Sequence, residues 1–158
     1  MTPARQEHVP ELAQAKTTVL SVDAMGGDKG PATVVAGLAR FLAEYSQARA
    51  ILHGPEAELR PLLTRAKISA DKVTISDAPD TVKMTDKPSQ VLRNAKSTSM
   101  WSAIEAVRDG KADVVISCGN TGALMALSTI RLRKLPGVNR PAIAILWPSR
   151  NPQGFNVM

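Results

Sequence analysis

Residues 18–31 read TVLSVDAMGGDKGP, a run of β-branched and apolar residues that closes on Asp23 and leads into a glycine-rich turn. Such a run predicts a buried β-strand, and the adjacent glycines predict a sharp change of direction after it. Pro31 suits the first turn of a following helix, because its missing N–H has no partner there in any case. The stretch therefore predicts a strand–turn–helix unit.

The same alternation continues along the chain. Apolar residues spaced three and four apart predict that the helix after residue 31 has one packed face, formed by Val34, Val35, Leu38, Phe41, Leu42 and Tyr45. Further strands are expected at residues 50–52, 73–75, 114–116 and 141–147. Further helices are expected at residues 55–66, 88–108 and 123–134. Pro61 predicts a kink or a break in the first of these. Alternating strands and helices indicate an α/β fold with a largely parallel sheet flanked by helices.

The net charge of +6 is concentrated toward the carboxyl end of the chain. Residues 1–113 hold 15 Lys and Arg against 14 Asp and Glu, whereas residues 114–158 hold five basic residues and no acidic one. A basic segment can indicate nucleic acid, an anionic surface or an anionic substrate. Aromatic residues make up only 3% and are scattered, so the stacking platforms of a single-strand binder are missing. We therefore expect an anionic ligand and no nucleic acid.

Several classes of protein are excluded by the composition. One cysteine and two histidines leave no disulfide framework and no multi-cysteine zinc site, and no metal is expected. The longest uncharged run, residues 114–130, includes polar residues and two glycines, unlike the roughly 20 apolar residues of a membrane span. Residues 1–16 lack the apolar core of a signal peptide, so we expect a flexible leader before an α/β domain at 17–158, in the reducing cytoplasm.

The glycine turn after the first strand is the first candidate anion site. Gly26 and Gly27 would let backbone N–H groups approach an anion closely, and Lys29 adds positive charge. The stretch is neither a Walker A sequence nor a G-x-G-x-x-G fingerprint. An ordinary tight turn between strand and helix is the alternative.

A second candidate follows the strand at 114–116, where residues 118–122 read CGNTG and a helix begins at once. Gly119 and Gly122 bracket Asn120 and Thr121, and a helix N-terminus favours phosphate or a developing oxyanion. Asn120 or Thr121 is equally expected as an ordinary N-cap. Cys118 is expected to be a small buried residue rather than a nucleophile.

A third candidate lies in the helix at 88–108. Arg93, Lys96 and Ser97 fall within about one helical turn of each other. A basic, hydroxyl-bearing face suits phosphate, and a solvated helix face is the alternative.

Four stretches in this order, VDAMGGDKGP, KPSQVLRNAKSTSM, ADVVISCGNTGALMA and RPAIAILWP, resemble the phosphate acyltransferases of bacterial phospholipid synthesis. The resemblance implies transfer of a fatty acyl group from acyl carrier protein to inorganic phosphate, which gives acyl phosphate without a cofactor. It implies an α/β fold similar to isopropylmalate dehydrogenase and phosphotransacetylase. It further implies a cytoplasmic homodimer, peripherally associated with the membrane, whose product serves a membrane glycerol-3-phosphate acyltransferase.

The implied reaction assigns roles to the candidate residues. A phosphate oxygen attacks the thioester carbonyl, so the site must bind an anion and stabilise a tetrahedral oxyanion. We expect catalytic residues among Asp23, Asp28, Lys96 and Asn120, with Asp23 or Asp28 orienting a donor. We expect phosphate to be bound by Gly26, Gly27, Lys29, Arg93, Ser97, Gly119, Thr121 and Gly122.

Family members are roughly twice this length, so the chain is expected to be their amino-terminal half and to be inactive or poorly folded alone. Cys118 stands where the family usually has alanine. Two other functions stay open, namely a phosphotransacetylase-like enzyme that uses acyl-CoA and a non-catalytic phosphate-binding fragment. A nicotinamide dehydrogenase is suggested only by analogy of fold.

Overall fold

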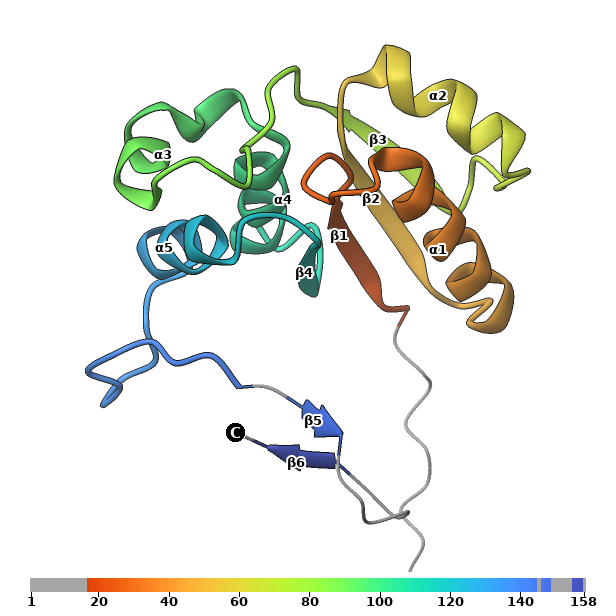
Figure 1. Ribbon diagram of the computed structural model, residues 1–158. Helices are drawn as coiled ribbons and strands as arrows, with labels where there is room; N and C mark the ends of the chain where they lie inside the picture. Colours follow the sequence, from red (N-terminus) through yellow and green to blue (C-terminus); the bar gives the residue numbers. More distant parts are fainter. Residues whose placement is uncertain (1–16, 145, 149–154, 158) are drawn as a thin grey trace, which may run out of the picture.

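Residues 17–144, 146–148 and 155–157 are described by the computed structural model, and the leader expected at 1–16 lies outside them (Figure 1). The strands of its main sheet are β1 (Val19–Asp23), β2 (Arg49–Gly54), β3 (Val73–Asp77) and β4 (Val114–Ser117). They run parallel in the order β3-β2-β1-β4. The expected α/β fold with a parallel sheet is confirmed.

Helices cover both faces of this sheet. They are α1 (Pro31–Glu44), α2 (Glu56–Arg65), α3 (Pro88–Asn94), α4 (Ser99–Arg108) and α5 (Thr121–Arg131), with a short 3-10 helix η1 (Ala95–Ser97). Figure 1 shows α1 and α2 on one side of the sheet and α4 on the other, with α5 packed against α4 and α3 packed against α5. Within the described residues, no helix is long and apolar enough to cross a membrane.

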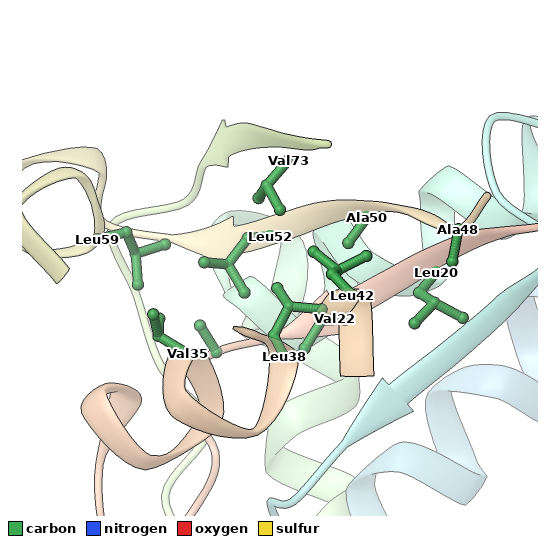
Figure 2. Packing of buried hydrophobic residues seen from close by; sticks show 11 residues of the cluster. Leu20, Val22, Val35, Leu38, Leu42, Ala48, Ala50, Leu52, Leu59 and Val73 are labelled. Atoms are coloured by element: carbon green, nitrogen blue, oxygen red, sulfur yellow. The ribbon is translucent and has the colours of Figure 1, made fainter. Parts of the chain in front are cut away.

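The main core lies between β1, β2 and α1 (Figure 2). Leu20 and Val22 alternate along β1 with polar residues and meet Leu38 of α1, while Leu52 of β2 is fully buried. Burying side chains of this size stabilises a fold by about 1.5–3 kcal/mol each. Pro31 opens α1 as expected, whereas Tyr45 lies just past its end and is exposed, in contrast to the expected packed face.

Of the two outcomes expected at Pro61, a kink or a break, the break is wrong, because α2 runs through this residue. Pro61 and Ala57, whose carbonyl loses its helical N–H partner, are both exposed. Water can therefore satisfy the carbonyl, and the proline is tolerated.

The single helix expected at 88–108 is also wrong. Thr98 has an extended backbone and its hydroxyl caps α4 by accepting the Trp101 N–H at 3.2 Å. The loop that follows β3 intervenes here, since Asp80 N–H donates to the Ser97 carbonyl at 3.2 Å and Ser99 N–H donates to the Asp80 carbonyl at 2.9 Å. These bonds replace the helical ones and divide the segment into α3, η1 and α4.

The strand expected at 141–147 is wrong in extent and in partner. Residues 141–144 have no regular structure, and β5 (Leu146–Pro148) pairs antiparallel with β6 (Phe155–Val157) in a separate two-stranded sheet. β6 follows β5 closely in the sequence, and an antiparallel pair needs only a short connection. The segment therefore adds no fifth strand to the main sheet.

Candidate functional site

The two predicted glycine turns lie side by side. β1 and β4 are neighbours in the sheet, and Asp23 pairs in register with Ser117 at their carboxyl ends. A Cβ placed on Gly26 would lie 2.7 Å from the Gly119 Cα, and one on Gly119 would lie 2.9 Å from the Gly26 Cα. Only glycine allows two backbones to approach this closely. The turns therefore form one unit at the sheet edge where parallel sheets bind ligands.

Asp23 lies beneath this unit and is 1% exposed. Its Oδ1 accepts the Ser99 hydroxyl at 2.6 Å and the Met25 N–H at 3.2 Å, and its Oδ2 accepts the Ser117 hydroxyl at 2.7 Å. Ser117 Oγ in turn accepts the Gly119 N–H at 3.1 Å. The carboxylate thus accepts hydrogen bonds from donors of the protein itself.

Ser99 and Ser117 were missed in the sequence. Ser117 was findable, because it ends the strand before CGNTG and parallel pairing would place it beside Asp23. Ser99 gave no comparable signal, since it lies 76 residues from Asp23 and the contact depends on how α4 packs.

Asn120 is the N-cap of α5, which begins two residues earlier than expected. Its Oδ1 accepts the Ala123 N–H at 3.0 Å. Its Nδ2 lies within 2.9–3.2 Å of three carbonyls of the loop after β3, those of Lys83, Met84 and Asp86, and its two protons are shared among them. The side-chain amide is therefore fully engaged in fixing α5 and this loop.

Backbone donors remain at the turns. The N–H groups of Gly27, Thr121 and Gly122 have no hydrogen-bond partner within the part of the chain that the structure describes. Those of Thr121 and Gly122 belong to the first turn of α5, where no carbonyl precedes them in the helix. Together with the positive end of the helix dipole, they form a local environment that favours an anion.

Asp28 and Lys29 are exposed and lie at the rim of an apolar pocket of about 570 Å³. The pocket is lined by residues of β1, α1 and β4, including Leu38 and Ile116, and by Cys118, which directly follows β4. Cys118 is exposed, so the expectation of a buried residue is wrong. The reason is that β4 is an edge of the described sheet and α1 does not reach across it.

Arg93, Lys96 and Ser97 are exposed on α3 and η1. In the described residues none of the three forms a hydrogen bond or ion pair with the glycine turns. Their segment does approach the turns, because a Cβ on Gly122 would lie 3.1 Å from the Pro88 Cγ at the start of α3. The structure thus places these groups near the site without contacts that fix them there.

His53, near the end of β2, is 1% exposed. Ser21 Oγ donates to the Ala103 carbonyl at 2.7 Å, so it accepts from His53 Nε2–H at 2.9 Å, and Ser102 Oγ donates to His53 Nδ1 at 2.8 Å. Burial lowers the pKa of His53 to about 4. The ring is therefore neutral near pH 7, with both nitrogens engaged. Among the described residues no three His, Cys, Asp or Glu side chains gather where they could hold a metal.

Comparison with known proteins gives a consistent result. Residues 18–158 match the family described as fatty acid synthesis protein. The phosphate acyltransferase of Ruegeria sp. strain TM1040 is 67% identical over 149 residues, which cover 94% of this chain and 40% of that protein. The phosphate acyltransferase of Paracoccus denitrificans is 65% identical over 140 residues, covering 89% and 38% respectively. The chain spans about 40% of the length of these relatives.

Proposed function

This chain belongs to the fatty acid synthesis protein family, and from that premise we propose that it forms part of an enzyme that transfers a fatty acyl group from acyl carrier protein to inorganic phosphate. The name phosphate acyltransferase, borne by relatives 60–67% identical to it, supports acyl transfer to phosphate. The proposal includes acyl phosphate as product, a cytoplasmic homodimer and peripheral membrane association. It also includes delivery of the product to a membrane glycerol-3-phosphate acyltransferase.

The observation that carries the proposal is the contact between the two glycine turns. Gly26 and Gly119 touch through their backbones, and the free N–H groups of Gly27, Thr121 and Gly122 flank this contact in sequence. Backbone donors at the N-terminus of an 11-residue helix favour phosphate. Lys29, exposed beside Gly27, adds a positive charge at the rim.

The chemistry requires no covalent enzyme intermediate. A phosphate oxygen forms a bond to the thioester carbonyl carbon, the carbonyl oxygen becomes an oxyanion, and the C–S bond then breaks. The carrier protein leaves as a thiolate that takes a proton from water. Phosphate is already ionised near neutral pH, so binding, orientation and oxyanion stabilisation by fixed N–H donors are the main requirements.

The residues have different parts in this proposal. Gly26 and Gly119 bring the turns together, while Gly27, Thr121 and Gly122 provide donors. Asn120 acts by holding α5 and the loop after β3 in place. Arg93 and Lys96 are exposed cations that attract the anionic substrates from solvent, and Ser97 adds an exposed hydroxyl beside them. Asp28 is an exposed carboxylate whose negative charge opposes this attraction, and its part is to orient a donor.

The test uses a full-length chimera that joins this chain to the portion of the Ruegeria phosphate acyltransferase beyond the matching stretch. We expect phosphate-dependent release of carrier-protein thiol from acyl carrier protein, at a rate close to that of the parental Ruegeria enzyme. Preference for acyl-CoA would favour the phosphotransacetylase-like alternative. If the chimera binds phosphate without turnover while the parental Ruegeria enzyme is active in the same assay, the non-catalytic fragment would be favoured.

A further inference from the structure

We propose that Ser99 and Ser117 are positioning residues of the phosphate site and act on it through the buried carboxylate of Asp23. The inference rests on the proposed function for the identity of the anion. Neither serine needs to touch substrate for this role. What they control is the relative placement of the two glycine turns.

The first step is the environment of Asp23. This carboxylate is 1% exposed and has no ion-pair partner among the described residues. A buried carboxylate is costly unless hydrogen bonds compensate its charge. Two hydroxyls and one backbone N–H do so here, at 2.6, 2.7 and 3.2 Å. Since Ser99 is the first residue of α4, the positive end of that helix adds to the compensation.

The second step links the carboxylate to both turns. In the turn after β1, the Met25 N–H donates directly to Asp23 Oδ1. In the turn after β4, the Gly119 N–H donates to Ser117 Oγ, whose own proton is held by Asp23 Oδ2. The position of the second turn therefore depends on the position of the carboxylate, through the two hydrogen bonds of Ser117.

The third step is the anchoring of the carboxylate itself. Ser99 is fully buried and donates the shortest of these bonds, 2.6 Å, to Oδ1. It is held in turn by its own N–H, which donates to the Asp80 carbonyl at 2.9 Å. Ser99 thus connects Asp23 to α4 and to the loop after β3. The helix α4 lies against β1 and β4 (Figure 1).

The fourth step is sensitivity. The backbones of Gly26 and Gly119 are so close that a Cβ on Gly26 would lie 2.7 Å from the other Cα and 2.9 Å from Asp23 Oδ2. A small shift of either turn must therefore move the other. We call the hydrogen-bonded set of Asp23, Ser99 and Ser117 the Asp23 clamp. Because the free N–H donors flank the glycine contact in sequence, a change in this clamp should appear first as a change in phosphate affinity.

The experiment compares Ser117→Ala, Ser99→Ala and the double variant in the full-length chimera. The KM for phosphate and the phosphate Kd from calorimetry should rise on the order of tenfold to a hundredfold, the usual effect of residues that orient a binding group. The KM for acyl carrier protein should change little. The double variant should show less than the product of the two single effects, since both serines act through one carboxylate.

Two further variants separate positioning from folding. Ser117→Thr keeps the hydroxyl and should restore most of the phosphate affinity, whereas Ser46→Ala, at an exposed serine far from the turns, should behave as wild type. The inference is overturned if Ser117→Ala leaves phosphate KM and Kd unchanged. It is also overturned if all kinetic constants and the Tm decline together without rescue by threonine.

The same measurements keep the inference apart from the proposed function. If the chimera binds phosphate but does not transfer acyl groups from carrier protein, the proposed function fails. The phosphate Kd of the variants then still shows whether Ser99 and Ser117 position the phosphate site. If the chimera turns over normally and the variants match it, the clamp fails and the proposed function stands.

Discussion

β1 and β4 are neighbouring strands of one sheet, and both read in the sequence as short apolar runs, yet they are buried very differently. Leu20 and Val22 of β1 are 7% and 5% exposed, whereas Val114 and Ile116 of β4 are 41% and 40% exposed. β1 has a strand on each side and helices over both faces (Figure 1). β4 has one strand neighbour in the described sheet, and only its Val115 face packs against a helix cluster.

The difference shows where the fold depends on further protein. Parallel sheets are normally covered on both faces, and the relatives are about 2.5 times longer than the matching stretch. The core around β1 is buried by the described residues alone. On β4, Val114 and Ile116 have no such cover among the described residues, and we propose that the rest of the full-length protein supplies it.

The largest effect is expected from adding that portion. The chimera should have a free energy of unfolding several kcal/mol above that of the 158-residue chain, and it should unfold at a higher urea concentration. The reason is that each large apolar side chain that becomes buried contributes about 1.5–3 kcal/mol. Only the chimera should be active. Hydrogen exchange gives a local check, since β4 amides should gain more protection than β1 amides. Equal protection of the two strands in the isolated chain would contradict the comparison.

The next effect tests the contact that joins the two strand ends. Gly26→Ala or Gly119→Ala in the chimera should destabilise it by about 1–3 kcal/mol through overpacking and abolish most phosphate-dependent activity. Gly37→Ala is the matched control, because a Cβ there meets nothing within 4 Å and alanine favours a helix. That control should be active and slightly more stable. A fully active Gly26→Ala would show that the turns do not need their close approach.

A third prediction concerns the face of β1 and β2 opposite the apolar core, where His53 is buried. Its folded pKa of about 4 lies below the ordinary value of 6.5, so the unfolded chain binds more protons between these pH values. Stability should therefore fall as pH drops from about 6.5 to 4, by about 3 kcal/mol from this group. Urea unfolding of the chimera and of His53→Gln across this range isolates the effect. Equal pH slopes in the two proteins would argue against a buried neutral ring.

The smallest effects are expected from the exposed basic residues. Lys29→Ala should raise the KM for phosphate about 1.4- to 5-fold, in line with the roughly 0.2–1 kcal/mol of a solvent-exposed charge. Arg93→Ala and Lys96→Ala should have weaker effects on phosphate, because no contact fixes them at the turns. Added salt should reduce all three differences. A larger rise in phosphate KM from Arg93→Ala than from Lys29→Ala would indicate that phosphate enters the site beside α3.

Local pattern is enough to predict the α/β fold and both glycine turns. The hydrophobic periods of strands and helices, and the glycines of the turns, depend only on residues that are close in the sequence. The N-cap role of Asn120 was among the readings open in the sequence. The division of the helix at 88–108 was not, since Asp80 creates it from a distant loop. The role of Ser99 could not be predicted for the same reason, since its contact with Asp23 joins residues far apart in the sequence. The exposure of Cys118 depends on which strand lies at the sheet edge.

The most direct measurement is the dependence of thiol release from acyl carrier protein on phosphate concentration, made with the chimera and with its Gly26→Ala variant. Saturable phosphate dependence in the chimera, and its loss in Gly26→Ala while the protein remains folded, is the predicted result. Thiol release that ignores phosphate, or that Gly26→Ala leaves unchanged, would contradict the assignment of the joined glycine turns as the phosphate site.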